Sequence, residues 1–125
     1  MEGLTIHEAA ETTGWSPRML RYIENAGLIE LSRSSSGYRL FGPEELQRLR
    51  TLRELLGRFD CALSDVAFAE RLRSHEELRV AVEQWFEARP EKPEGVAPND
   101  WLSWEQQKHQ RLIEPETTRL TETAA

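Results

Sequence analysis

Cysteine, lysine and long apolar runs are all scarce in this chain of 125 residues, and each scarcity excludes a class of protein. Cys61 is the only cysteine, which excludes an internal disulfide framework and a cysteine-cluster zinc or iron–sulfur site within one chain. No apolar run approaches the roughly 18–20 residues of a membrane-spanning helix. No basic segment followed by an apolar stretch opens the sequence, so we expect no secretory signal, no membrane association and a cytoplasmic location.

Signatures of catalysis are missing as well. The sequence has no nucleophile beside a base, no phosphate-binding glycine loop and no metal-ligand spacing, so we expect no enzyme, no catalytic residue, no metal and no cofactor. His7, His75 and His109 are too scattered in the sequence to suggest a ligand set. We expect Cys61 to be a small core residue rather than a reactive thiol.

The net charge of −6 argues at first against a nucleic-acid partner, but the kind of basic residue changes along the chain. Lys92 and Lys108 are the only lysines, so every basic residue before position 90 is an arginine. Binding to DNA depends on the local field rather than on the net charge. The N-terminal part can therefore still present a basic face.

Helix-capping signals divide the first 42 residues. Residues 5–8 (TIHE) form a capping box that starts a helix, and Gly14 ends it. Ser16 and Pro17 start a second helix as N-cap and first residue, and Gly27 ends that one. Two short helices joined by a tight turn that contains glycine are typical of a helix-turn-helix.

A small β-hairpin is predicted next, from residues 28–31 and 38–41 around a serine- and glycine-rich tip. A third helix then begins at Gly42 and Pro43, with leucines at spacings of three and four on one face. Ser64 and Asp65 begin a fourth helix.

The second helix carries the most informative pattern. Arg18, Arg21 and Asn25 share one face, while Met19 and Ile23 belong to the opposite, apolar face. Arginine can donate two hydrogen bonds to guanine or bind phosphates, so this face suits a DNA major groove. On this helix alone, an ordinary solvated face with surface arginines explains the pattern equally well. The donor-rich hairpin that follows favours the DNA interpretation, because its tip suits the phosphate backbone.

These segments together resemble the DNA-binding domain of the MerR family of bacterial transcriptional regulators. The likeness covers residues 4–73. Its motifs are 5–10 (TIHEAA), 13–24 (TGWSPRMLRYIE), 27–29 (GLI), Arg33 and 37–41 (GYRLF). The resemblance implies a winged helix-turn-helix, with the second helix as recognition helix and residues 31–41 as wing. It also implies DNA contacts by eight residues: Trp15, Ser16, Arg18, Arg21, Tyr22, Arg33, Tyr38 and Arg39.

The chain departs from the family pattern at three positions. Ile23 stands where a second aromatic residue is usual, Leu31 where a proline commonly precedes the wing, and Gly42 where a hydroxyl or carboxylate cap is usual.

Beyond residue 74, a helix over 75–89 carries Leu78, Val82 and Trp85 on one stripe. We expect this stripe to be the interface of a homodimer, covered either by a second subunit or by a later helix of the same chain. A proline-rich linker, a helix from Trp101 to residue 113 that ends before Pro115, and a frayed tail over 116–125 follow. Trp85, Trp101 and Trp104 either line a small apolar pocket or pack the final helix onto the dimer helix.

The sequence therefore predicts a mainly α-helical chain with three parts. Residues 1–73 are the winged helix-turn-helix, residues 74–90 a short dimerisation helix, and residues 91–125 a linker, a tryptophan-bearing helix and a tail. The expected function is regulation of transcription by a nucleoid-associated homodimer on double-stranded promoter DNA. The dimer would bind and distort a pseudo-palindromic site, with RNA polymerase or another regulatory protein as a further candidate partner.

Two alternatives remain open from the sequence. One is an architectural or recombination accessory protein, like the winged domains of excisionases, that binds along DNA as a cooperative monomer. The other is a protein-interaction module that uses the acidic, tryptophan-bearing C-terminal region.

Overall fold

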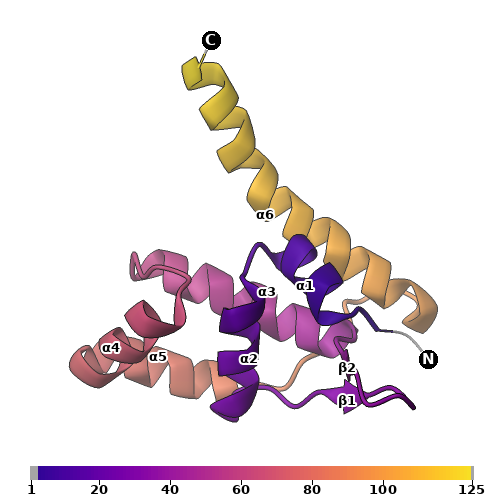
Figure 1. The fold of residues 1–125 in the computed structure, drawn as a ribbon. Helices are drawn as coiled ribbons and strands as arrows, with labels where there is room; N and C mark the ends of the chain where they lie inside the picture. The colour runs from indigo at the N-terminus through magenta and orange to yellow at the C-terminus, as the bar shows by residue number, and fades with distance from the viewer. Residues whose placement is uncertain (1–2, 125) are drawn as a thin grey trace.

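The computed structural model describes residues 3–124, and side chains as far as residue 112. Within that range the chain is mostly helical, with one small antiparallel sheet (Figure 1). The elements are α1 (Ile6–Thr13), α2 (Pro17–Asn25), β1 (Ser32–Arg33), β2 (Arg39–Leu40), α3 (Pro43–Arg58), α4 (Asp65–Ser74), α5 (Glu76–Glu87), a 3-10 turn η1 (Pro98–Asp100) and α6 (Trp101–Ala124). None of these helices is both long and apolar enough to cross a membrane.

The capping predictions for the first two helices are confirmed. The Thr5 hydroxyl accepts a hydrogen bond from the backbone N–H of Glu8 at 3.2 Å, and the Glu8 carboxylate accepts one from the N–H of Thr5 at 2.9 Å. The Ser16 hydroxyl accepts from the N–H of Met19 at 3.0 Å, with Pro17 at the first helical position. Gly14 ends α1 at a φ of 79°, a left-handed conformation that glycine adopts without strain. Local sequence therefore determines where α1 and α2 begin and where α1 ends.

The long helix α3 is the centre of the fold, and α1, α5 and α6 all pack against it. Its buried face consists of Leu46, Leu49, Leu52, Leu55 and Leu56. Because this face joins one contiguous core that runs from Leu4 to Trp85, the first five helices share a single apolar interior.

The wing is shorter than expected and begins later. β1 pairs with β2 over two residues each, with Ser32 opposite Leu40 and Arg33 opposite Arg39. Residues 28–31 were expected to form the first strand, but Leu28 and Leu31 pack against the core instead. A bridge between Leu4 and Phe41, with both hydrogen bonds at 2.8 Å, joins the base of the wing to the N-terminal segment.

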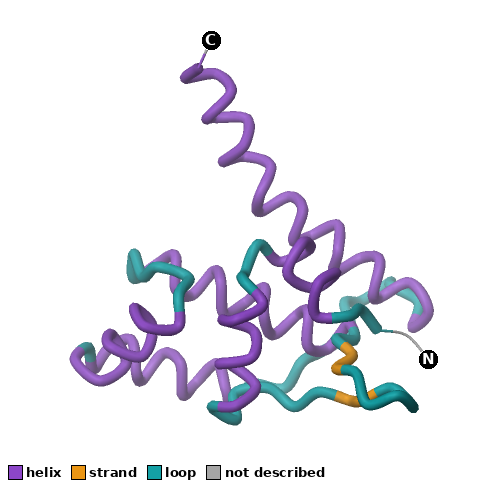
Figure 2. Tube along the Cα trace, in the orientation of Figure 1, coloured by secondary structure: helices purple, strands orange, loops and turns teal. Residues whose placement is uncertain are grey.

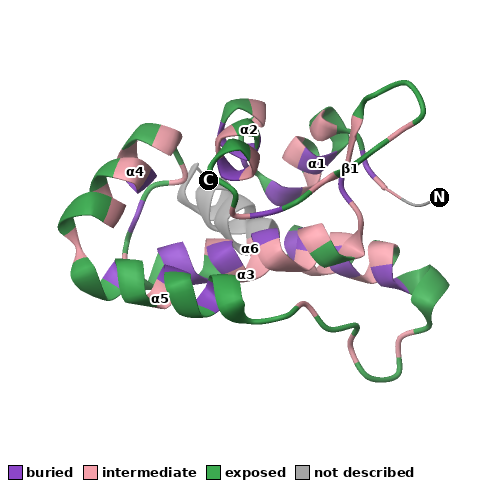
Figure 3. Ribbon diagram, turned by 90° about the horizontal axis from the view of Figure 1, so that it is seen from below, coloured by how far each residue is buried: buried purple, intermediate pink, exposed green. Residues whose placement is uncertain are grey.

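Helix α5 buries the stripe that was expected to form a dimer interface. Leu78, Val82 and Trp85 are 0%, 5% and 9% exposed within one chain, and α5 packs against α3 and α4. Figure 3 shows the buried residues of α5 on the side that faces α3 and exposed residues along its outer side. The expectation that a second subunit covers this stripe is corrected, because α3 of the same chain already covers it.

A second difference concerns the last helix. The backbone of α6 continues through Pro115 to residue 124, where the sequence predicted an end before the proline and a frayed tail (Figure 2). An interior proline lacks one N–H donor and its ring crowds the preceding turn, yet the backbone is helical on both sides of Pro115. The second half of α6 extends past the other helices (Figure 1). Residue 125 of the expected tail lies outside the described residues.

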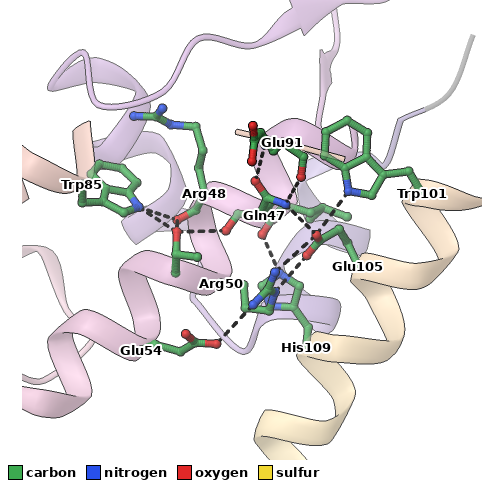
Figure 4. Close-up of polar contacts among 11 residues, drawn as sticks. Gln47, Arg48, Arg50, Glu54, Trp85, Glu91, Trp101, Glu105 and His109 are labelled. Atoms are coloured by element: carbon green, nitrogen blue, oxygen red, sulfur yellow. Dashed lines mark hydrogen bonds and ion pairs between the residues drawn. The ribbon is translucent and has the colours of Figure 1, made fainter. Parts of the chain in front are cut away.

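Polar side chains, rather than apolar ones alone, attach α6 to α3 (Figure 4). Glu105 has no exposed surface and accepts hydrogen bonds from Arg50 Nε at 2.9 Å and from the Trp101 indole N–H at 3.2 Å. His109, 1% exposed, lies 2.7 Å through Nε2 from the carbonyl oxygen of Leu46. Trp101 therefore supports the contact of α6 with α3 through Glu105. The sequence predicted that the tryptophans pack the final helix onto the helix over 75–89, and the partner is corrected to α3.

Candidate nucleic-acid interface

Helix α2 separates its two faces sharply. Met19, Leu20 and Ile23 are fully buried, and this anchors the helix to the core. Arg18 and Arg21 lie on the exposed side, and the Arg18 side chain is 76% exposed. The helix therefore presents two guanidinium groups to solvent from a rigid support.

Arg18 has a partner that lies far away in the sequence. Its Nε donates to Asp65 Oδ2 at 2.9 Å, and Asp65 is the first residue of α4. This hydrogen bond from Arg18 is the main cause that holds the pKa of Asp65 below its ordinary value. The pair directs the guanidinium of Arg18 along the surface towards α4.

The wing arginines are held by an acidic residue of α2. Glu24 accepts from Arg39 Nε at 2.6 Å and from Arg33 Nη2 at 3.2 Å. The side chains of Glu24 and Arg39 are only 16% and 26% exposed, whereas that of Arg33 is 47% exposed. Helix α2 and both strands of the wing thus meet at one carboxylate.

The tip of the wing presents an aromatic side chain. Ser34 closes the turn, because its N–H donates to the Tyr38 carbonyl at 2.8 Å and its hydroxyl accepts from the Tyr38 N–H at 3.1 Å. Gly37 occupies the left-handed position of the turn at a φ of 88°. Tyr38 itself is 70% exposed, so its phenol lies at the surface beside the wing arginines.

Trp15 does not lie on this surface. It is 1% exposed and belongs to the core, so its ring does not reach the face that carries Arg18 and Arg21. The residue before a helix N-cap commonly packs inward against the first turns of the helix, which explains the burial. We therefore remove Trp15 from the candidate interface, as a correction of the sequence-based expectation.

The remaining expected contacts differ in how accessible they are. The hydroxyl of Ser16 is used by the helix cap. Tyr22 is partly buried, and its ring contacts Phe68 of α4 edge to face at 6.1 Å between centroids. Their role at DNA stays a prediction.

Other arginines hold the fold together. Arg48 donates to the carbonyl oxygens of Leu28, Phe86 and Ala88. Arg53 donates to the carbonyl of Thr13 at 2.8 Å, and Arg71 to that of Phe59 at 2.8 Å. Because these partners are far apart in sequence, the pattern of arginines alone could not separate structural ones from those available to a ligand.

Sequence reasoning also missed the two acidic residues at this surface, Asp65 and Glu24. Each was part of a helix signal, the first turn of α4 and the last turn of α2. Nothing in their local spacing indicates a pairing with arginines 47 and 15 residues away.

No metal site is visible in the part of the chain that the structure describes, since no three His, Cys, Asp or Glu side chains gather there. Cys61 is buried, and burial raises the pKa of its thiol, so it is a core residue as expected.

Comparisons with known proteins agree with this geometry. Residues 4–67, just over half of the chain, match the family described as MerR HTH family regulatory protein. The chain is also 41% identical over 51 residues to "Heavy metal-dependent transcription regulator 2" of Rhizobium meliloti (strain 1021). That match covers 40% of this chain and only 35% of the relative. No solved structure matches the chain significantly.

The matched residues contain α1, α2, the wing, α3 and the first residues of α4, which together carry the exposed arginines and their acidic partners Glu24 and Asp65. The chain belongs to the MerR family of helix-turn-helix regulatory proteins.

Proposed function

We propose that this protein regulates transcription by sequence-specific binding to double-stranded DNA. The observation that carries the proposal is the common surface of α2 and the wing, where Arg18, Arg21, Arg33 and Arg39 lie on a rigid support. Family membership and the regulatory relative support the same conclusion.

Helix α2 and the wing make different contacts with DNA in this proposal. Arg18, in the first turn of α2, reads a base edge in the major groove, and Arg21 lies one turn further along the same face. Arg33, Tyr38 and Arg39 contact phosphates beside it, which sets the register of the helix without reading sequence.

We further propose that two copies bind a pseudo-palindromic site. Two recognition helices would enter successive major grooves about 34 Å apart. Distorting promoter DNA between them would require a deformation energy of about 1–6 kcal/mol, supplied by phosphate contacts. RNA polymerase or another regulatory protein is then a further candidate partner.

The second copy needs a contact surface other than the buried stripe of α5. Sedimentation of the whole chain at tens of micromolar tests this point, and a monomer would contradict the dimer.

The function itself is tested by selecting duplexes from a random-sequence pool with the full chain. Wild-type protein should enrich one motif with two-fold symmetry, and the double variant Arg18→Ala, Arg21→Ala should lose that enrichment. Arg79→Ala, which removes an exposed arginine of α5, is the matched control and should enrich the same motif as wild type. An array of direct repeats would favour a cooperative accessory protein, and no enrichment at all would contradict the proposal.

A further inference from the structure

A single carboxylate joins the recognition helix to both strands of the wing. Glu24 lies in the last turn of α2, and its two oxygens accept from different arginines, Oε1 from Arg39 and Oε2 from Arg33. Arg33 and Arg39 are direct cross-strand partners in the hairpin. Glu24 therefore bonds to both members of one cross-strand pair, one in β1 and one in β2. We call Glu24, Arg33 and Arg39 the Glu24 clamp.

The wing needs such support. Each of its strands has only two residues, and an isolated two-stranded hairpin is marginally stable at best in water. The base of the wing is fixed by the bridge between Leu4 and Phe41. Further towards the tip, the clamp attaches the hairpin to α2, and its partly buried pair of Glu24 and Arg39 is less screened than a surface pair.

The charge of Glu24 is at odds with its position. A carboxylate at a DNA-binding surface repels phosphates and offsets part of the positive charge of the two arginines. If electrostatics alone mattered, removing this charge would strengthen binding. The clamp contributes to binding only if the fixed position of the wing outweighs this repulsion.

We propose that Glu24 is a positioning residue that sets the height and angle of the wing relative to α2, so that helix and wing contact one DNA site together. The inference rests on the proposed function. Each clamp arginine keeps donors that Glu24 does not use, because Arg39 bonds it through Nε and Arg33 through one Nη. Those remaining N–H groups can bind phosphates while the clamp stays closed.

Glu24→Gln tests the clamp because glutamine keeps the shape of the side chain but loses its charge and one acceptor oxygen. Affinity for the duplex enriched by wild-type protein should fall about tenfold, the scale expected for losing a hydrogen bond to a charged group. Glu30→Gln is the matched control, since it removes the same charge from an exposed position just before the wing. It should leave affinity unchanged or raise it.

A double-mutant comparison separates positioning from a general loss of stability. In a background that already carries Arg33→Ala and Arg39→Ala, Glu24→Gln should cause no further loss of affinity, because the clamp no longer exists. If Glu24→Gln binds as tightly as wild type or tighter, or weakens that background as much as it weakens wild type, the inference is wrong.

Amide hydrogen exchange of the free protein tests the clamp without DNA. Exchange at residues 33–39 should accelerate in Glu24→Gln, while the buried amides of α3 should exchange as in wild type. Unchanged exchange in the wing would overturn the clamp even if the protein binds DNA. Failure of wild-type protein to enrich any duplex would overturn the proposed function instead, so the two failures can be told apart.

Discussion

At the scale of single residues, the acidic partners decide what each arginine can do. Arg18 bonds to the first residue of α4 and Arg71 lies within α4, yet Arg18 bonds to the carboxylate of Asp65 and Arg71 to the backbone carbonyl of Phe59. A guanidinium that satisfies a backbone carbonyl of its own chain is part of the fold. One that is 76% exposed and paired through a single nitrogen still has donors for a base edge.

Replacing Asp65 with asparagine tests the pairing with Arg18. The change removes a negative charge beside the interface, so binding to DNA of any sequence should strengthen. The freed Arg18 should discriminate less well at the base that it reads, because its orientation is no longer fixed. Competition binding with the enriched duplex and with single-base variants measures both effects.

Asp100→Asn, an exposed charge change in η1 away from α2 and the wing, is the control for the Asp65 experiment. It should leave discrimination at every base unchanged. An Asp65→Asn protein with wild-type discrimination at every base would assign Arg18 to the phosphate backbone.

At the scale of elements, α3 determines how the C-terminal half of the chain is arranged. Its leucine face is part of the core. Other residues of α3 form hydrogen bonds with Trp85 of α5 and Glu105 of α6. The Trp85 indole donates to Thr51 Oγ1 at 2.9 Å and to the Arg48 carbonyl at 3.0 Å, so even the edge of the α5 stripe is bonded to α3. Helix α5 is therefore part of the folded body.

Two valines of α5 provide a matched test of this arrangement. Val82 is 5% exposed and Val80 is 45% exposed. Val82→Ala should lower the free energy of unfolding by about 1–2 kcal/mol through lost burial and a small cavity. Val80→Ala should change it by less than about 0.5 kcal/mol. Urea denaturation measures both, and sedimentation should show the same oligomeric state for both. A Val82→Ala protein that changes its oligomeric state but keeps its stability would show that a second subunit covers the stripe.

At the scale of the whole molecule, the buried contact between α3 and α6 makes stability depend on pH. Burial is the largest cause that lowers the pKa of His109 below its ordinary value of 6.5, and the positive charges of Arg50 and Arg53 add to it. The Leu46 carbonyl and Glu105 act in the opposite direction. The folded chain thus keeps His109 neutral at a pH where the unfolded chain protonates it.

Stability should therefore fall as the pH is lowered through 6.5, because the unfolded state then binds a proton that the folded state does not. One such histidine contributes a slope of at most about 1.4 kcal/mol per pH unit, which ends once the folded state also binds the proton. Urea denaturation of the whole chain between pH 7 and about 5.5 should show this loss.

His109→Gln is the control for the pH experiment, since its amide N–H can still donate to the Leu46 carbonyl but does not titrate. Its unfolding free energy should be flatter over the same interval. Equal slopes for wild type and His109→Gln would show that another group titrates.

The sequence by itself determined the features that depend on neighbours a few residues apart. The capping box at Thr5, the start of α2 at Ser16 and Pro17, and the placement of Arg18 and Arg21 on one face all follow from hydrogen bonds and spacings within one helical turn. The family motif, read in the same residues, predicted the winged helix-turn-helix and the membership that the comparison confirmed.

The tertiary structure alone decided how those local elements are used. It buried Trp15, covered the α5 stripe with α3 and paired the arginines of the surface with Glu24 and Asp65. The ion pairs and the Trp85 contacts among these outcomes join residues that are 9 to 47 positions apart in the chain. Local propensity carries no information about such contacts, because they form only when packing of the core brings distant segments together.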